Sequence, residues 1–255
     1  MFNEAENAPG LLAEIAKALD GKLAYEVIAV NDGSTDDTEA VLLDVQTRMP
    51  QLRVITHGKN SGQSASIISG VSCARAQWIA TMDGDGQNDP GDIPELFKYT
   101  SEVLRPGSPL LIAGHRRKRN DNWIRRLSSR VANHVRQSLL NDGCADTGCG
   151  LKIFERDVFM RMPHFDHLHR FLPALFRIAH GRIVNVPVNH RPRSFGQSKY
   201  GVWDRLWVGI MDILGVRWLQ KRCHVSPADS QPNEVFADER SRRQAEQARI
   251  SSVGA

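Results

Sequence analysis

Short runs of apolar, mainly β-branched residues alternate along this chain with longer segments in which apolar residues recur every three or four positions. The short runs predict buried strands, and the longer segments predict amphipathic helices. Strands and helices that alternate at this spacing are typical of an α/β domain, with a mostly parallel sheet and helices on both faces. The expected strands are 26–30, 52–56, 78–82, 110–114 and 183–188, and the expected helices include 4–19 and 63–76.

The apolar run that starts at Trp78 ends in two carboxylates, Asp83 and Asp85, which are one residue apart and are followed by Gln87. A glycine after each carboxylate leaves room for a diphosphate to approach. Hard divalent cations such as Mg²⁺ and Mn²⁺ prefer oxygen ligands, and one or two carboxylates commonly hold them together with the phosphates of a substrate. An isolated pair of this kind is more often an ordinary acidic turn, so the metal-site hypothesis depends on the rest of the chain.

Polar residues also follow the strand expected at 26–30. Asn31 and Asp32 come directly after it, and residues 34–36 are of the types that cap helices. In open α/β sheets, ligands bind at the carboxyl ends of the strands, so Asp32 is a candidate for hydrogen bonding to a base or a ribose. Capping of the next helix explains the motif equally well. Neither a Walker-type loop nor a dinucleotide-binding glycine motif follows any strand, which argues against an ATPase or a dinucleotide-binding enzyme.

Composition narrows the possible partners. The 255 residues are 41% hydrophobic, enough for one domain with a sizeable core. The net charge is only +4, but basic residues crowd the segment 116–136, which predicts an anionic ligand there. Trp123 is the one aromatic residue of this segment, so a nucleic-acid partner is not expected. Cysteines without zinc-type spacing fit a reducing cytosol.

The segment 201–224 carries tryptophans and aliphatic residues at helical spacing, interrupted by charged residues. It is too charged to span a bilayer, and it fits an amphipathic helix in a membrane interface, with cations facing anionic lipid. A core helix or a dimer face would show a similar pattern. Residues 225–255 are polar and charged, which predicts a disordered tail. We therefore expect one catalytic domain over 1–200, followed by this helix and this tail.

Several motifs occur in the order seen in family 2 glycosyltransferases, over roughly the first 220 residues. They are the motifs at 3–7, 30–36, 59–62, 82–87, 148–150 and 193–200. The chain most closely resembles the dolichol-phosphate mannosyltransferase type, a kind of polyprenyl-phosphate glycosyltransferase. The resemblance implies a nucleotide-sugar-binding GT-A fold, dependence on Mg²⁺ or Mn²⁺, and inverting transfer of a sugar from a GDP- or UDP-sugar to a polyprenyl phosphate.

The resemblance also implies roles for individual residues. Asp85 and Gln87 would bind the metal ion, and Asp83 would hold the sugar or the ribose. Asp146 would position a phosphate acceptor, which is already charged and needs no base, or would act as a base for a hydroxyl acceptor. The nucleotide-sugar would contact Asn3, Glu4, Asn31, Asp32, Lys59, Asp83, Arg193 and Lys199, and the acceptor phosphate would contact Arg116, Arg125 and Ser129.

Relatives of this type normally open with an apolar strand that ends Val-Pro-Val-Tyr-Asn-Glu, whereas this chain begins at the counterpart of the last three of those residues. We therefore expect the first strand to be absent and the true start to lie upstream. The expected location is the cytoplasmic face of the inner membrane, as a peripheral protein with a membrane partner or as a homo-oligomer. A glycan or lipid hydroxyl acceptor and a non-catalytic nucleotide-sugar binder are the alternatives, and a nucleic-acid binder, whose binding would depend on salt, is the remaining rival. The motifs do not determine which sugar or which nucleotide base the donor carries.

Overall fold

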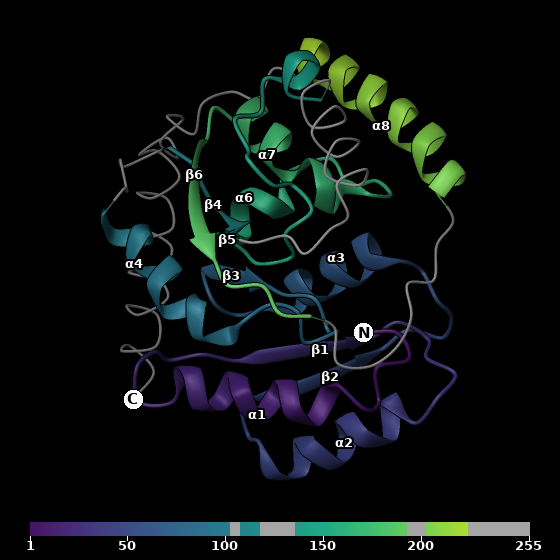
Figure 1. Ribbon diagram of the computed structural model, residues 1–255, viewed down its shortest axis with the longest axis vertical. Coiled ribbons are helices and arrows are strands. Elements are labelled where there is room, and N and C mark those ends of the chain that lie inside the picture. The colour runs from purple at the N-terminus through teal and green to yellow at the C-terminus, as the bar shows by residue number, and fades with distance from the viewer. Residues whose placement is uncertain (103–107, 118–135, 193–201, 224–255) are drawn as a thin grey trace, which may run out of the picture.

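The computed structural model describes residues 1–102, 108–117, 136–192 and 202–223 (Figure 1). Strands and helices alternate as the apolar pattern predicts. The helices are α1 (Ala8–Leu19), α2 (Thr38–Arg48), α3 (Gln63–Cys73), the short 3₁₀ helix η1 (Pro90–Asp92), α4 (Ile93–Glu102), α6 (Arg156–Met160), α7 (Leu168–Ile178) and α8 (Val202–Arg222). The strands are β1 (Val27–Asn31), β2 (Leu52–Thr56), β3 (Trp78–Thr81), β4 (Leu110–Arg116), β5 (Lys152–Glu155) and β6 (Arg182–Val188).

The strands form two sheets. β1 and β2 pair in parallel, with Val27 opposite Leu52. The second sheet has the order β3-β5-β4-β6, in which β4 and β6 are parallel and β5 runs antiparallel to both β3 and β4. The expectation of a mostly parallel sheet is therefore wrong, because two of the four pairings in the described part of the chain are antiparallel. The cause is β5, a strand of four residues that the apolar pattern did not reveal.

Helices cover both faces of the four-stranded sheet, as expected. Successive strand residues point to opposite faces. In β4, Leu110 and Ile112 join the core cluster beside α1 and α4, whereas Leu111 joins the cluster beside α3, α6 and α7. Ile153 and Phe154 of β5 divide between the same two clusters. The continuous apolar run of β4 thus corresponds to a strand that is buried on both faces.

The first helix starts later than expected, at Ala8 instead of residue 4. Residues 3–7 form a turn, because the backbone N–H groups of Asn7 and Ala8 both donate to the carbonyl oxygen of Glu4, at 3.0 and 2.9 Å. Pro9 lies in the first turn of α1, where the N–H that proline lacks would have no helical partner. The turn leaves the motif at residues 3 and 4 outside the helix, where it can reach other loops.

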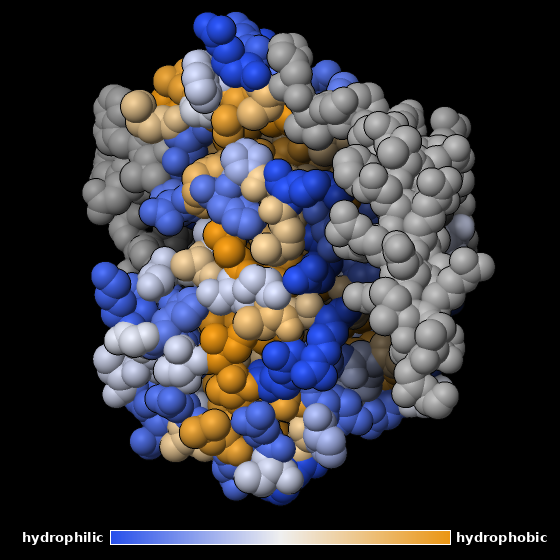
Figure 2. Space-filling view, turned by 180° about the vertical axis from the view of Figure 1, so that it is seen from behind, coloured by the Kyte–Doolittle hydropathy of each residue, from blue (hydrophilic) through white to orange (hydrophobic). Residues whose placement is uncertain are grey.

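Two helical layers mark the ends of the molecule (Figure 1). α1 and α2 pack against β1 and β2 at one end, and α8 lies outside α7 at the other. Val216 of α8 is buried against Phe171 of α7, whereas Met211 and Trp218 on the outer side of α8 are 65% and 60% exposed. Seen from behind, apolar side chains form an interrupted band down the middle of the surface (Figure 2). Among the helices in the described ranges, none has both the length and the apolar content to cross a membrane.

Candidate active site

The acidic turn after β3 is held from both sides. The Thr81 hydroxyl at the end of β3 donates to the carbonyl oxygen of Gly150 at 2.9 Å, which ties the strand to the loop before β5. Inside the turn, the backbone N–H of Asp83 donates to Asn88 Oδ1 at 3.2 Å, and that of Gln87 donates to Asp85 Oδ1 at 3.1 Å. These bonds fix both carboxylates at the carboxyl end of β3, the edge where ligands bind in α/β folds.

Asp83 lies in a close-fitting polar cradle. Its Oδ1 accepts a 2.7 Å hydrogen bond from Gln63 Nε2, and a Cβ atom added to Gly150 would lie only 2.3 Å from its Oδ2. Burial raises the pKa of Asp83, and the nearby Asp85 raises it further, while Lys152 and Arg116 oppose both effects. A buried carboxylate beside a second carboxylate is a suitable place for a divalent cation.

The residues present fit the predicted metal ion. The described residues contain no group of three or more His, Cys, Asp or Glu side chains that could hold a metal on their own. Mg²⁺ commonly takes one or two protein carboxylates and completes its shell with water and substrate phosphates, so the carboxylate of Asp85 with the side-chain oxygen of Gln87 is sufficient. The Gln87 side-chain amide donates to the carbonyl oxygen of Arg191 at 3.4 Å, which leaves its own oxygen available as a ligand. Metal binding by Asp85 and Gln87 stays a prediction.

Asp32 connects the ends of β1 and β2. Its Oδ1 accepts from the backbone N–H of Ser61 at 3.0 Å and lies 2.7 Å from His57 Nδ1, and its Oδ2 accepts from the N–H of Gly62 at 2.8 Å. Burial opposes its ionisation, but these hydrogen bonds prevail, and the pKa of Asp32 is lowered. Asp32 therefore orders the loop that carries Lys59; a contact with the nucleotide stays a prediction.

The other predicted nucleotide residues gather around the same loops. Asn3 has a left-handed backbone, with φ of 54°, and its Oδ1 accepts from the N–H of Thr35 at 2.8 Å. The N–H of Glu4 donates to the Thr38 hydroxyl at 2.9 Å, so both residues of the N-terminal motif lie against the loop that follows β1. At Gly33, an added Cβ would be 2.4 Å from the carbonyl carbon of Lys59, so the loops after β1 and β2 touch through the backbone. The structure thus brings together the predicted residues Asn3, Glu4, Asn31, Asp32 and Lys59.

Arg116 and Asp146 pair with each other. Arg116 donates from Nε to Asp146 Oδ2 at 2.6 Å and from Nη2 to Oδ1 at 2.8 Å, a two-pronged ion pair. Sequence reasoning gave the two residues separate tasks on the acceptor, and did not foresee this contact. Four other predicted contact residues lie outside the described residues: Arg125, Ser129, Arg193 and Lys199.

Three residues beside Asp83 were not found from the sequence. They line a cavity of about 170 Å³ between Gln63, Asp83 and the first turn of α7, and they are Lys152, His169 and Arg170. Lys152 is buried, donates from Nζ to the carbonyl oxygens of Thr147 and Cys149, and has its pKa lowered by burial. Burial also lowers the pKa of His169 to about 3, and its Nδ1 lies 2.9 Å from the Ser64 hydroxyl.

A further cation outside the sequence prediction closes the acidic turn on its other side. Arg191 pairs with Glu14 at 2.6 Å and with Asp89 at 2.9 Å, and its backbone N–H donates to the carbonyl oxygen of Gln87 at 2.9 Å. The sequence signal that could have identified Arg191 was its position, two residues before the predicted Arg193. Arg191 anchors the segment that leads into the last motif to the acidic turn.

An α/β fold with two carboxylates at the carboxyl end of β3, beside the loops that follow β1 and β2, defines a class of proteins that bind ligands at this edge of the sheet. Residues 1–162 match the family described as Glycosyl transferase family 2, and the chain belongs to that family.

Among its relatives is the dodecaprenyl-phosphate galacturonate synthase of Rhizobium johnstonii. The two are 32% identical over 228 residues, which cover 87% of this chain and 65% of the relative. The chain thus spans somewhat less than two thirds of the length of that protein. The match confirms the resemblance to polyprenyl-phosphate glycosyltransferases.

Solved structures share the fold. Glucosyl-3-phosphoglycerate synthase from Mycobacterium tuberculosis, in complex with Mn²⁺, UDP and phosphoglyceric acid, superposes with a TM-score of 0.63 and 17% identity, covering 89% of this chain and 78% of that one. A mannosyltransferase from Pyrobaculum calidifontis, in complex with GDP-Man and Mn²⁺, superposes with a TM-score of 0.61 and 15% identity, covering 89% of this chain and 64% of that one. These likenesses establish the α/β fold of GT-A glycosyltransferases.

Proposed function

We propose that this chain is a metal-dependent, inverting glycosyltransferase that moves a sugar from a nucleotide diphosphate to a polyprenyl phosphate. The observation that supports it best is the convergence of Asp32, which follows β1, with Asp83 and Asp85, which follow β3; all three line one cavity of about 640 Å³. The nucleotide would bind at the loops that Asn3 and Asp32 order, with its diphosphate toward Asp85.

Each group has a chemical task in this proposal. Asp85 and Gln87 would hold Mg²⁺ or Mn²⁺, which stabilises the negative charge that develops on the leaving diphosphate. Asp83, kept in place by Gln63 and Gly150, would orient the sugar. Arg193 and Lys199 would add positive charge to the diphosphate, and Arg125 and Ser129 would bind the acceptor phosphate beside Arg116.

The Arg116–Asp146 pair favours a phosphate acceptor over a hydroxyl acceptor. Both oxygens of Asp146 accept hydrogen bonds from one guanidinium, so the carboxylate is held in place and has fewer lone pairs left to take a proton. A hydroxyl acceptor requires a base, whereas a lipid phosphate is already charged near neutral pH. We therefore assign Asp146 to positioning of the acceptor through Arg116.

The cavity of about 170 Å³ beside Asp83 is where we place the donor sugar. Arg170 and the buried Lys152 line this cavity together with Asp83, and His169 is neutral at physiological pH because of its low pKa. Arg170 could pair with the carboxylate of a hexuronate, which a neutral hexose lacks. The galacturonate named for the Rhizobium relative agrees with this choice.

A membrane surface would present the acceptor. On the outer side of α8, Met211, Leu214 and Trp218 are exposed beside Arg217 and Lys221. Apolar and aromatic side chains flanked by cations are typical of a helix that lies on an anionic bilayer. The four cysteines are free thiols, which fits the cytosolic side of that membrane.

The test is transfer of labelled sugar from UDP- and GDP-sugars, including the matched pair UDP-galacturonate and UDP-galactose, to dodecaprenyl phosphate in vesicles with Mn²⁺. Asp85→Ala should abolish the lipid-linked label, as should chelation, whereas Asp44→Ala on the surface of α2 should not. Sugar-nucleotide binding without transfer to any acceptor would refute the proposal that the chain is an enzyme, and would favour a non-catalytic binder. Transfer that requires a hydroxyl acceptor would refute the assignment of a phosphate as the acceptor. Preference for UDP-galactose over UDP-galacturonate would refute the assignment of a hexuronate as the donor sugar.

A further inference from the structure

The inner face of α8 carries a carboxylate that meets the start of α7. Val216 of α8 is buried against Phe171 of α7, and Asp212 lies one helical turn earlier on the same side of α8. Asp212 Oδ2 is buried and accepts no hydrogen bond from the described residues, and it lies 3.0 Å from Nδ1 of His167. A buried carboxylate oxygen is costly without a compensating partner, and His167 is placed to supply one.

His167 also determines how α7 begins. It precedes the helix and has a left-handed backbone, with φ of 65° and ψ of 8°. This conformation is unfavourable for a residue with a side chain, so it persists only where the surroundings hold it. The carbonyl oxygen of His167 accepts from the backbone N–H of Arg170 at 3.0 Å, which joins it to the first turn of α7. The contact with Asp212 therefore holds the residue from which this turn starts.

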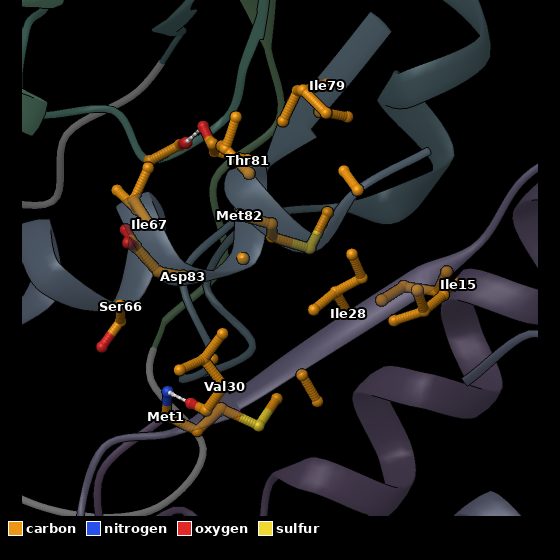
Figure 3. Close-up of a pocket in the computed structure, with 18 of the residues that line it drawn as sticks. Met1, Ile15, Ile28, Val30, Ser66, Ile67, Ile79, Thr81, Met82 and Asp83 are labelled. Atoms are coloured by element: carbon orange, nitrogen blue, oxygen red, sulfur yellow. Dashed lines mark hydrogen bonds between the residues drawn. The ribbon is translucent and has the colours of Figure 1, made fainter. Parts of the chain in front are cut away.

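The first turn of α7 is part of the wall of the cavity of about 170 Å³, because His169 and Arg170 line it. Residues of α3 and of the end of β3 line both this cavity and the larger one of about 640 Å³ (Figure 3): Ile67, Thr81 and Asp83. His169 Nδ1 lies 2.9 Å from the hydroxyl of Ser64 in α3. The turn is thus held to α3 through Ser64 and to α8 through Asp212.

We propose that Asp212 is a positioning residue for the donor sugar: by holding His167, it keeps the first turn of α7 in place as a wall of the sugar cavity. Asp212 is not among the residues that line that cavity, so it acts on the sugar only through this turn. The inference rests on the proposed function, which places the sugar there. α8 is also the helix that we place on the membrane, so one helix would connect the surface that presents the acceptor with the cavity that receives the donor.

The test compares the binding of UDP-galacturonate with that of UDP, which lacks the sugar, by calorimetry with Mn²⁺. Asp212→Leu removes the carboxylate and keeps a side chain of similar size. It should weaken UDP-galacturonate binding about tenfold and leave UDP binding unchanged, because a displaced turn affects only the sugar. Asp212→Asn should lose less, because its amide oxygen can still accept from the imidazole. The matched control, Val216→Ala, loosens the same helix face without removing the contact, so it should lower the melting temperature and leave both affinities unchanged.

Exchange of the two partners tests the contact directly. His167→Asp alone brings two carboxylates together and should weaken UDP-galacturonate binding as Asp212→Leu does. Aspartate tolerates the left-handed backbone at position 167, so the exchange does not disturb the start of α7. Combined with Asp212→His, it restores the contact with the partners reversed and should recover the affinity to within about threefold of the unvaried protein.

The titration of His169, followed by NMR, needs no donor. In Asp212→Leu the displaced turn should expose the ring to water and raise its pKa from about 3 toward the ordinary value of 6.5, whereas Val216→Ala should not. If the unvaried protein binds neither UDP-galacturonate nor UDP, the proposed function fails, and the titration still decides whether Asp212 fixes the turn.

Three results would overturn the proposal. The first is an equal loss of UDP and UDP-galacturonate affinity in Asp212→Leu, which would mean that the residue acts on the whole fold. The second is an equal loss of UDP-galacturonate affinity in Asp212→Leu and Val216→Ala, which would assign the effect to general loosening of α8. The third is an unchanged pKa of His169 in Asp212→Leu, which would show that the turn keeps its place without the carboxylate.

Discussion

Removal of either partner of the Arg116–Asp146 pair should destabilise the fold by about 3 kcal/mol, the lower end of the range for a buried ion pair left with one charge. The lower end applies because the side chains are 16% and 9% exposed, which allows some hydration of the remaining charge. In a protein of this size the loss corresponds to a fall of roughly 6–12 °C in melting temperature. The double variant, with no unpaired charge, should be less destabilised than the sum of the two single variants.

The measurement is a double-mutant cycle with Arg116→Met and Asp146→Asn, followed by urea unfolding with tryptophan fluorescence. We expect a coupling of about 2 kcal/mol, within the range for residues in one hydrogen-bonded network. The exposed Lys98–Glu95 pair is the matched control, since its side chains are 63% and 60% exposed, and Glu95→Gln should have an effect below about 1 kcal/mol. Additive single effects, each below about 1 kcal/mol, would show that the pair is not a structural unit.

Three further changes test other parts of the site and surface. Gly150→Ala should weaken Mn²⁺-dependent sugar-nucleotide binding at least tenfold by calorimetry, because the new Cβ displaces the Asp83 carboxylate, whereas Gly10→Ala, with no atom within 4 Å, should not. Folding lowers the pKa of His169 to about 3, from an unfolded value near 6.5. The free energy of unfolding should therefore be highest above pH 6.5 and should fall by up to about 1.4 kcal/mol per pH unit between pH 6.5 and pH 3. In urea titrations at different pH values, His169→Gln should remove this dependence on pH. Trp218→Asp should reduce sedimentation with anionic vesicles at least fivefold, whereas Leu43→Asp, at an exposed apolar site on α2, should leave it unchanged; loss with both or with neither would contradict a membrane role for α8.

The sequence was most informative where chemistry is local. The residues that follow β1, β2 and β3 were identified from the ends of apolar runs, and parallel strands bring such ends to one edge. The pattern failed at β5, because four residues that begin with a lysine do not resemble a buried strand. Lys152 is nevertheless buried, since the carbonyl oxygens of the preceding loop satisfy its ammonium group. Local patterning contains no information about such a long-range partner.

The same limit explains the missed contacts around the carboxylates. Gln63 was assigned to a helix, and nothing in its neighbourhood indicates that it reaches Asp83. Arg116 and Asp146 were both recognised as site residues, yet they are 30 positions apart and the sequence offers no sign that they pair. The motifs allowed the residue types of the site to be inferred. Which of these residues pair with one another depends on how β5 enters the sheet.

The antiparallel insertion of β5 also sets the order in which this protein can form on the ribosome. Thr81 of β3 pairs with Lys152 of β5, which lies 71 residues later in the chain. This edge of β3 therefore stays unpaired until β5 has been synthesised. At ordinary translation speeds this delay is roughly 4–14 s, during which an apolar strand edge is available to other nascent chains. A lower growth temperature and abundant holdase chaperones should therefore raise the yield of folded protein.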